Sequence, residues 1–516
     1  MMPQSRIGTS KTLLKTTLLF GLASLAFGCN DAEWRYDNGY YGYPDYMYEN
    51  GGEYRDQSGS EDVHVEFPEN EFIDTSEENR STFSVDVNTA SYTLMRRDLN
   101  RGVLPNPASV RAEEFINFFR FEYPSPAEDP FSINMEVAPS YFGSDDDINR
   151  HLLRIGLRGK DVALEDMKPN NLVFLIDVSG SMGPENRLPL AKQSLHILLD
   201  NLRPTDTVAI QTYANGTERV LSPTPVSERQ TITAAINGLV ASGGTFGEGG
   251  IVQAYNMAEE AFVDGGNNRV IILTDGDFNI GARGEDLYGI IESYRDRNIT
   301  LTAAGFGLGR YHDATMERIA REGSGNYYYI DTLAEAERIF GTHLPSTLEV
   351  IASDVRIQVI FDEDVVRRYR LVGYEKRVLE NEDFEDESTN AAEVGPGHTV
   401  TAFYELELHE EPSLDSPFLA EVRIRYKEEL GAPESLEIQN YIKLNQILDT
   451  FEEASPGFRF AAAVAYFASV LRHSQFAPAT RFDEIIAIGD AAKYADYPEQ
   501  AEFLELVSLA EDLWVD

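Results

Sequence analysis

Apolar and amphipathic segments alternate strictly from Asn171 to about Ile339, and this alternation constrains the fold more than any other feature of the chain. The apolar runs are "LVFLID", "TVAIQTYA", "RVIILTDG", "ITLTAAGFG" and "NYYYID". The segments between them have helical spacing. The run "LVFLID" is almost unbroken, which is typical of a parallel strand covered on both faces. Strict alternation implies right-handed crossovers, so the sequence predicts an α/β fold with a doubly wound parallel sheet.

Side chains with oxygen ligands follow the predicted strands. Asp177 ends the first apolar run, and Ser179 and Ser181 come next on a glycine-containing turn. Thr245 lies in the glycine-rich loop "SGGTFGEGG", and Asp275 ends a later strand. Ligands of such sheets bind beyond the carboxyl ends of the strands, so we expect these five residues to converge. Two carboxylates and three hydroxyls suit Mg²⁺, Mn²⁺ or Ca²⁺ and do not suit zinc or copper.

This set resembles the metal-ion-dependent adhesion site of von Willebrand factor type A domains, which has Asp-x-Ser-x-Ser, a later Thr and a later Asp. The resemblance implies that Ser179, Ser181 and Thr245 are direct or near-direct ligands, and that Asp177 and Asp275 hold the ion largely through water. An ion with a mostly neutral inner shell keeps much of its positive field. A carboxylate of another protein can then complete the coordination. We expect Mg²⁺ as the cofactor, with Ca²⁺ and Mn²⁺ as alternatives.

Both flanks of this domain are similar to those of a family of bacterial lipoproteins with a central type A domain. The similar segments are "FSVDVNTASYTLMRRDLNRGVLPNPASVRAEEFINFF", "RFAAAVAYFASVLRHSQF" and "AEFLELVSLAEDL". We predict an N-terminal flank at 81–169, the type A domain at 170–345, a β-rich region at 346–445 and a helical region at 446–516. Strands before residue 170 and after residue 350 alternate polar and apolar residues, and are expected to complete one sandwich around the inserted α/β domain.

The start of the chain predicts export. Residues 1–28 combine basic residues with an apolar run from Leu18 to Phe27, which is typical of a signal peptide. The run ends just before Cys29, the single cysteine of the chain. This arrangement resembles the lipobox of bacterial lipoproteins, and implies a lipidated Cys29 that anchors the protein to a membrane of the cell envelope. An ordinary signal peptide followed by an unrelated cysteine is the alternative.

Residues 29–80 differ from the rest of the chain in composition. Tyr, Gly, Asp, Glu and Asn dominate this segment, and aliphatic residues are few. Such a segment buries too little apolar surface to offset its chain entropy. We predict a disordered tether, and a tyrosine-rich binding segment is the alternative.

Charge excludes several kinds of partner. The chain has 43 Lys and Arg against 87 Asp and Glu, a formal net charge of −44. Nucleic-acid binding requires a cationic face, so we expect no nucleic-acid partner. Electrostatic attachment to anionic lipid is excluded for the same reason.

The motifs favour a binding protein over an enzyme. "DVSGS" lacks the first glycine of a nucleophile elbow, and "GGTFGEGG" lacks the Lys-Ser/Thr ending of a phosphate loop. We therefore expect an envelope protein whose bound cation contacts an acidic residue of a protein partner. Two alternatives remain open: an envelope structural or assembly protein in which the ion only holds the loops together, and, more remotely, a metal-dependent hydrolase.

Overall fold

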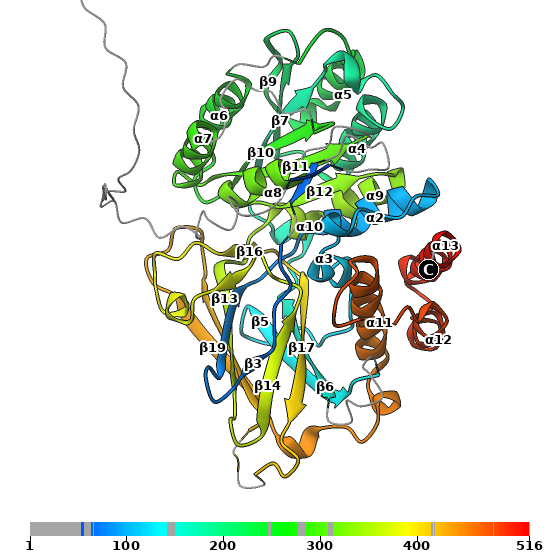
Figure 1. Cartoon of the computed structure of the whole chain (residues 1–516). Helices are drawn as coiled ribbons and strands as arrows, with labels where there is room; N and C mark the ends of the chain where they lie inside the picture. Colours follow the sequence, from blue (N-terminus) through cyan, green and yellow to red (C-terminus); the bar gives the residue numbers. More distant parts are fainter. Residues whose placement is uncertain are drawn as a thin grey trace, which may run out of the picture. The chain divides into compact units, whose positions relative to one another are not determined.

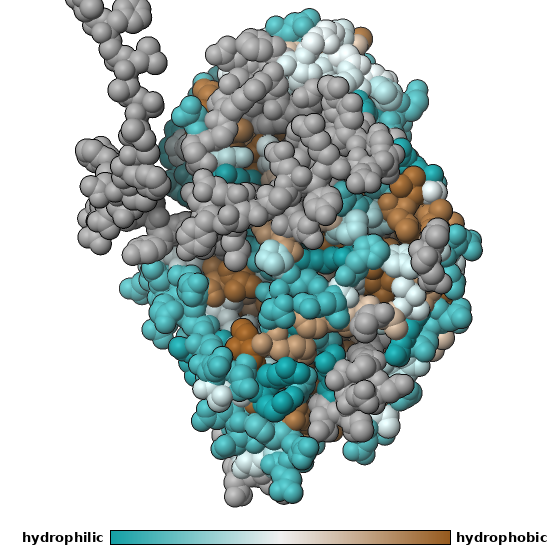
Figure 2. Space-filling view, in the orientation of Figure 1, coloured by the Kyte–Doolittle hydropathy of each residue, from teal (hydrophilic) through white to brown (hydrophobic). Residues whose placement is uncertain are grey.

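The computed structural model describes most of the chain from residue 53 onward. The described residues are 53–55, 63–65, 67–141, 150–245, 249–276, 285–307, 313–413, 416, 418–477 and 479–514. The predicted signal peptide and Cys29 therefore lie outside the described residues. Within these ranges, no helix combines the length and the apolar character needed to cross a membrane. The face in Figure 2 is mostly hydrophilic where it is coloured, in keeping with the charge of the chain.

The α/β domain contains a six-stranded sheet in the order β12-β11-β10-β7-β8-β9. Its strands are β7 (Asn170–Asp177), β8 (Thr207–Tyr213), β9 (Thr217–Pro225), β10 (Asn267–Thr274), β11 (Ile299–Phe306) and β12 (Tyr327–Ile330). Five strands are parallel, as predicted, and β9 adds an antiparallel edge that the sequence did not indicate. Only Leu221 of β9 is buried, so its sequence lacks the apolar run of an interior strand.

Helices cover both faces of this sheet (Figure 1). They are α4 (Leu188–Asn201), α5 (Arg229–Gly238), α6 (Gly250–Glu260), α7 (Glu285–Arg295), α8 (Asp313–Glu322), α9 (Leu333–Glu337) and α10 (Leu344–Leu348). In β7, Leu172, Phe174 and Ile176 share a core with α4 and α5. Val173 and Leu175 point the other way, into the core with α6 and α7. Two covered faces therefore explain the unbroken apolar run of β7.

The second body is a β-sandwich into which the α/β domain is inserted. One sheet has the order β15-β4-β13-β18-β19, with β16 paired to β13, and the other has the order β3-β14-β17-β6-β5. The strands that precede the α/β domain are β3 (Ile73–Asp74), β4 (Arg80–Ser84), β5 (Phe131–Pro139) and β6 (Arg150–Gly159). Those that follow are β13 (Ala352–Phe361), β14 (Val366–Val372), β15 (Val378–Leu379), β16 (Ala392–Val394), β17 (Thr399–Leu408), β18 (Ala420–Lys427) and β19 (Leu436–Ile442). Since β4 pairs with β13, β6 pairs with β17 and both sheets share one core, the prediction of a single sandwich is confirmed.

The prediction of a disordered tether is wrong for residues 67–80. Phe67 is buried, and the Asn70 side chain donates to the carbonyls of Leu371 (3.1 Å) and Gly373 (2.7 Å). The Thr75 hydroxyl donates to the Val366 carbonyl, and β3 pairs with β14. Upstream, β1 (Glu53–Arg55) pairs with β2 (Val63–Val65). Backbone pairing and polar side chains, which composition does not register, order this segment.

Helices of the two ends of the chain share a third core. These are α2 (Ala90–Asn100) and α3 (Ala112–Ile116) from the N-terminal flank, and α11 (Pro456–Leu471), α12 (Phe482–Ala492) and α13 (Pro498–Leu513) from the tail. Aromatic rings meet edge to face within it: Phe119 contacts Phe460 and Phe503. Because α2 also packs against β12, through Leu94 and Tyr327, the N-terminal flank connects the tail to the α/β domain.

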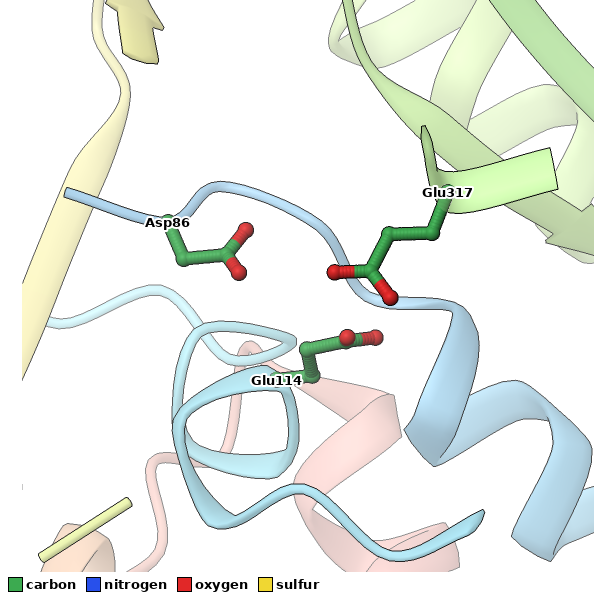
Figure 3. Close-up of side chains that lie close together, drawn as sticks. All are labelled: Asp86, Glu114 and Glu317. Carbon is green, nitrogen blue, oxygen red and sulfur yellow. The ribbon is translucent and has the colours of Figure 1, made fainter. Parts of the chain in front are cut away.

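A buried cluster of charges lies where three parts of the chain meet (Figure 3). Asp86 follows β4, Glu114 lies in α3 and Glu317 lies in α8, and ligand oxygens of the three carboxylates are within 4.8 Å of one another. All three side chains are buried. By geometry alone, such a cluster is a candidate metal site. Whether neighbouring cationic side chains already pair with the carboxylates distinguishes a metal site from a set of ion pairs.

Each of these carboxylates already has a cationic partner. Arg377 Nε donates to Asp86 Oδ2 (2.8 Å), and Lys376 Nζ donates to Glu317 Oε2 (2.5 Å). Arg111 pairs with Glu114 and also with Asp313 of α8 (2.6 Å). Burial alone would raise the pKa of Glu317, but the charges of Lys376, Arg111 and Arg377 lower it to about 2. Each carboxylate of the cluster is paired with a cation, so we interpret the cluster as an ion-pair junction.

Removing one cation from this junction is expected to destabilise the whole chain. Lys376→Met leaves Glu317 ionised and buried without its hydrogen-bonded partner, which costs about 3–5 kcal/mol of unfolding free energy. Lys493→Met is the matched control because Lys493 pairs with Asp490 at the surface, where such a pair is worth about 1 kcal/mol or less. Denaturant unfolding of both variants measures the difference. Equal effects would contradict the junction's structural role.

Candidate divalent-cation site

The turn that follows β7 holds two hydroxyls side by side. Asp177 is fully buried at the end of the strand, and its Oδ1 accepts a hydrogen bond from the Ser179 backbone N–H (2.8 Å). Its Oδ2 accepts from the Thr274 hydroxyl at 3.3 Å. The Oγ atoms of Ser179 and Ser181 are 2.9 Å apart. The carboxylate therefore fixes the turn, and the turn brings the two serine oxygens together.

The loop that carries Thr245 is hydrogen-bonded to this turn. Gly180 N–H donates to the Gly243 carbonyl (3.0 Å), and Ser242 N–H donates to the Val178 carbonyl (2.8 Å). Gly243 has φ +84°, and a Cβ there would overlap the Asn215 side chain, so glycine is required. These bonds place the chain next to Ser179 and Ser181 two residues before Thr245. Residues 246–248 lie outside the described ranges.

Asp275 follows β10, which pairs directly with β7, so it reaches the same edge of the sheet. Its carboxylate is buried, and its Oδ1 has no hydrogen-bond partner among the described residues. A buried carboxylate oxygen without a donor is costly, and a cation or its bound water would satisfy it. The residues present therefore fit a hard divalent ion.

Arg187 is a member of the site that the sequence did not reveal. Its Nη1 donates to Asp275 Oδ2 (2.6 Å) and to the Ser181 carbonyl (2.6 Å), so it links the two loops. Gly307, with φ +83°, makes room for it, because a Cβ there would overlap the arginine side chain. In the sequence, an arginine just before a helix is indistinguishable from a solvated residue. A nonlocal pairing of this kind leaves no sequence signal.

The local charges favour a cation. Burial and, to a smaller extent, the nearby charge of Asp275 raise the pKa of Asp177 to about 6, although hydrogen bonds from Ser179 oppose the rise. Two carboxylates thus stand close together with one guanidinium between the loops. Hydrogen bonds tie together the parts of the chain that hold Asp177, Ser179, Ser181 and Asp275, and the backbone pairing brings the loop of Thr245 to them.

Three family descriptions match successive parts of the chain. "Von Willebrand factor type A domain" matches residues 171–342, "von Willebrand factor" matches 58–150, and "Uncharacterized protein YfbK, C-terminal" matches 346–513. The first confirms the fold expected for the α/β domain. Von Willebrand factor type A domains commonly bind a divalent metal and mediate protein interactions.

Whole-chain comparisons extend this result. The uncharacterized protein YfbK of Escherichia coli K12 is 35% identical over 478 residues, covering 86% of this chain and 80% of the relative. The uncharacterized protein sll0103 of Synechocystis is 28% identical over 36% of this chain, and the match covers 44% of its length. A solved von Willebrand factor type A structure from Catenulispora acidiphila is 17% identical, covers 76% of this chain and 89% of its own, and has a TM-score of 0.43. On the extent of the first match, the chain belongs to the YfbK family, with a central von Willebrand factor type A domain.

Proposed function

We propose that Asp177, Ser179, Ser181, Thr245 and Asp275 hold a divalent cation, most readily Mg²⁺, with Ca²⁺ and Mn²⁺ as alternatives. The observation that carries the proposal is the buried Asp275 Oδ1 that lacks a donor. It belongs to the same edge of the sheet as the paired hydroxyls of Ser179 and Ser181. The ion, when bound, supplies a positive centre that can accept one more oxygen ligand.

The proposed activity is the capture of an acidic side chain of a protein partner, and not catalysis. Asp177 is committed by its hydrogen bonds to fixing the turn, and the serine hydroxyls bond to each other. The chain's own residues thus build and orient the site, and the partner brings the carboxylate. If the ion only held the loops together, the protein would be an envelope structural component, and the experiment below separates these functions.

The location of this activity follows from the N-terminal sequence. We propose that residues 1–28 are removed and that Cys29 is lipidated, so that the protein is exported and anchored to a membrane of the cell envelope. The net charge of −44 argues against a nucleic-acid partner. Mass spectrometry of the mature N-terminal peptide tests this: we expect a diacyl-modified Cys29 at its start. A mature chain that keeps residues before Cys29 would exclude the anchor.

Magnesium is expected to stabilise the chain through this site. At a concentration of 100 times Kd, a ligand that binds only the folded state adds about 2.7 kcal/mol, so the unfolding temperature should rise with Mg²⁺. Asp275→Asn and Thr245→Ala should abolish that rise. Asp264→Asn, at an exposed residue, and Thr224→Ala, at a partly exposed one, are matched controls on the same domain, and should retain it. An identical rise of the unfolding temperature with Mg²⁺ in all four variants would contradict the proposed site.

Ligand exchange at the ion distinguishes capture of a partner protein from a purely structural ion that only holds the loops together. Immobilised wild-type protein should retain an envelope partner in Mg²⁺, release it in chelator, and release it again when excess free carboxylate is added. Asp275→Asn should capture nothing, and Asp264→Asn should behave as the wild type. A Mg²⁺ shift in unfolding temperature together with capture that ignores chelator would favour the structural alternative.

Arg187 is expected to limit the affinity for the ion. Its guanidinium occupies Asp275 Oδ2, and a like charge at about 4 Å costs a few kcal/mol at an effective dielectric constant of about 20. Arg187→Met should therefore tighten Mg²⁺ binding roughly tenfold, equivalent to about 1.4 kcal/mol. Arg219→Met removes the same charge from an exposed pair with Glu260, and should leave the affinity unchanged. Calorimetric titration with Mg²⁺ measures the affinity of both variants and of the wild type. Weaker Mg²⁺ binding by Arg187→Met would contradict this expectation and show that the guanidinium positions Asp275 for the ion.

A further inference from the structure

A second polar site lies at the junction of the N-terminal flank, the α/β domain and the sandwich. It is a cavity of about 30 Å³, enough for about two water molecules at 10–15 Å³ each. Arg120 of the flank, Arg338 and His343 of the α/β domain and His398 of the sandwich contribute to its lining. The rest of the lining consists of uncharged residues. In a chain with a net charge of −44, a cavity with this lining is unexpected.

Arg120 has no ion-pair partner among the described residues. None of them makes a hydrogen bond or an ion pair with its guanidinium, although the side chain is partly buried. Burial lowers the pKa of Arg120, the charges of Arg158 and Arg338 act in the same direction, and those of Tyr497 and Asp161 oppose them. Buried charges in proteins are paired or hydrogen-bonded, because the cost of desolvation is otherwise uncompensated. Arg120 therefore offers the cavity a partly buried guanidinium that is not paired with a described carboxylate.

Arg338 and His343 are brought to the cavity by an unusual backbone. The segment η5 (Arg338–Thr342) is a turn of π-helix, and the His343 N–H donates to the Arg338 carbonyl at 2.9 Å. π-Helical turns are rare and occur frequently at functional sites. Two nitrogens of Arg338 already have partners within the chain. Its Nε and Nη2 donate to Glu335, and Nη2 also donates to Thr89. The π-turn places the two side chains on the same cavity wall.

The two histidines are neutral donors at the cavity. Burial lowers the pKa of His343 to about 2 and that of His398 to about 3, with the charges of Arg338 and Arg120 adding to both shifts. His398 Nδ1 accepts a hydrogen bond from the Gly395 N–H (3.1 Å), so its proton is on Nε2. A neutral imidazole with a fixed tautomer donates one hydrogen bond without adding charge.

We propose that this cavity binds a small oxyanion, of the carboxylate or phosphate class, with Arg120 as its main charge partner. Arg338 and the imidazole N–H groups of the histidines complete the donor set. The oxyanion would hold the flank, the π-turn and the start of β17 together, because each contributes to the lining. The proposal is independent of the cation site, since none of the five proposed cation ligands lines this cavity.

Inorganic phosphate, acetate and chloride at matched ionic strength test the proposal on metal-stripped full-length protein. Calorimetry should show saturable one-to-one binding of phosphate or acetate and none of chloride, and the better ligand identifies the class. Arg120→Gln should weaken binding at least tenfold. Arg101→Gln, an exposed arginine of the same flank, should bind as the wild type, and so should Asp275→Asn, which disables only the cation site.

Stability without anion separates binding from a structural role. In chloride alone, Arg120→Gln should unfold at a higher temperature than the wild type, because it removes an uncompensated charge. With saturating oxyanion the order should reverse. No saturable binding by the wild type, equal binding by Arg120→Gln, or a less stable Arg120→Gln in chloride would each overturn the proposal.

Discussion

The buried ion-pair junction is the interaction on which the arrangement of this chain depends. Asp86 and Glu114 come from the N-terminal flank, Glu317 from the inserted α/β domain, and Lys376 and Arg377 from the sandwich. Arg111 pairs with Glu114 within the flank, and the other pairs of the junction join different parts of the chain. An unpaired buried carboxylate costs several kcal/mol of unfolding free energy. Separating the parts would leave such carboxylates unpaired, so the ion pairs favour the packed arrangement. Arg96 repeats the principle, since it pairs with Asp331 (2.6 Å) of the α/β domain and Glu502 (3.2 Å) of the tail. These pairs couple the parts of the chain more specifically than apolar contact alone.

The candidate cation site is built differently, on loops that are fixed by backbone bonds. Gly180 and Gly243 allow two loops to meet through main-chain groups, and the buried Asp177 fixes the turn between strand and hydroxyls. Hydrogen bonds within the chain therefore orient Asp177, Ser179 and Ser181, three of the proposed ligands. Arg187 is the exception, because its long side chain can leave Asp275 when a divalent cation competes for the carboxylate. Such a site can exchange ligands while the sheet beneath it stays unchanged.

Sequence reasoning succeeded where the signal was local and failed where it was not. The apolar run of β7 predicted a strand covered on both faces. The positions of the polar residues after the strands predicted which loops lie at the same edge of the sheet. The edge strand β9 was missed because one side of it faces solvent and its residues are polar. The order of residues 67–80 was missed because it depends on hydrogen bonds to β14, far along the chain. The roles of Arg187 and Arg120 were missed because they depend on the surrounding residues in the folded chain, and the sequence does not show whether a charged residue is buried.

The distribution of charge connects these observations. The chain has about twice as many acidic as basic residues, yet several of its arginines and lysines lie in the interior, among them Arg96, Arg111, Arg356 and Arg377. Acidic side chains that remain outside repel one another. Arg96, Arg111 and Arg377 inside the molecule pair with carboxylates, and Arg356 donates to the backbone carbonyls of Asp383 and Asp386. Arg120, which is partly buried and has no ion-pair partner among the described residues, is the cation for which we propose a ligand. The carboxylate of Asp275 has one oxygen without a hydrogen-bond partner, as those of Glu317 and Glu393 do, and it alone of the three belongs to the proposed cation ligands. The two proposed sites thus share one argument: a charged group that the described residues leave partly unpaired can be satisfied by a ligand from solution.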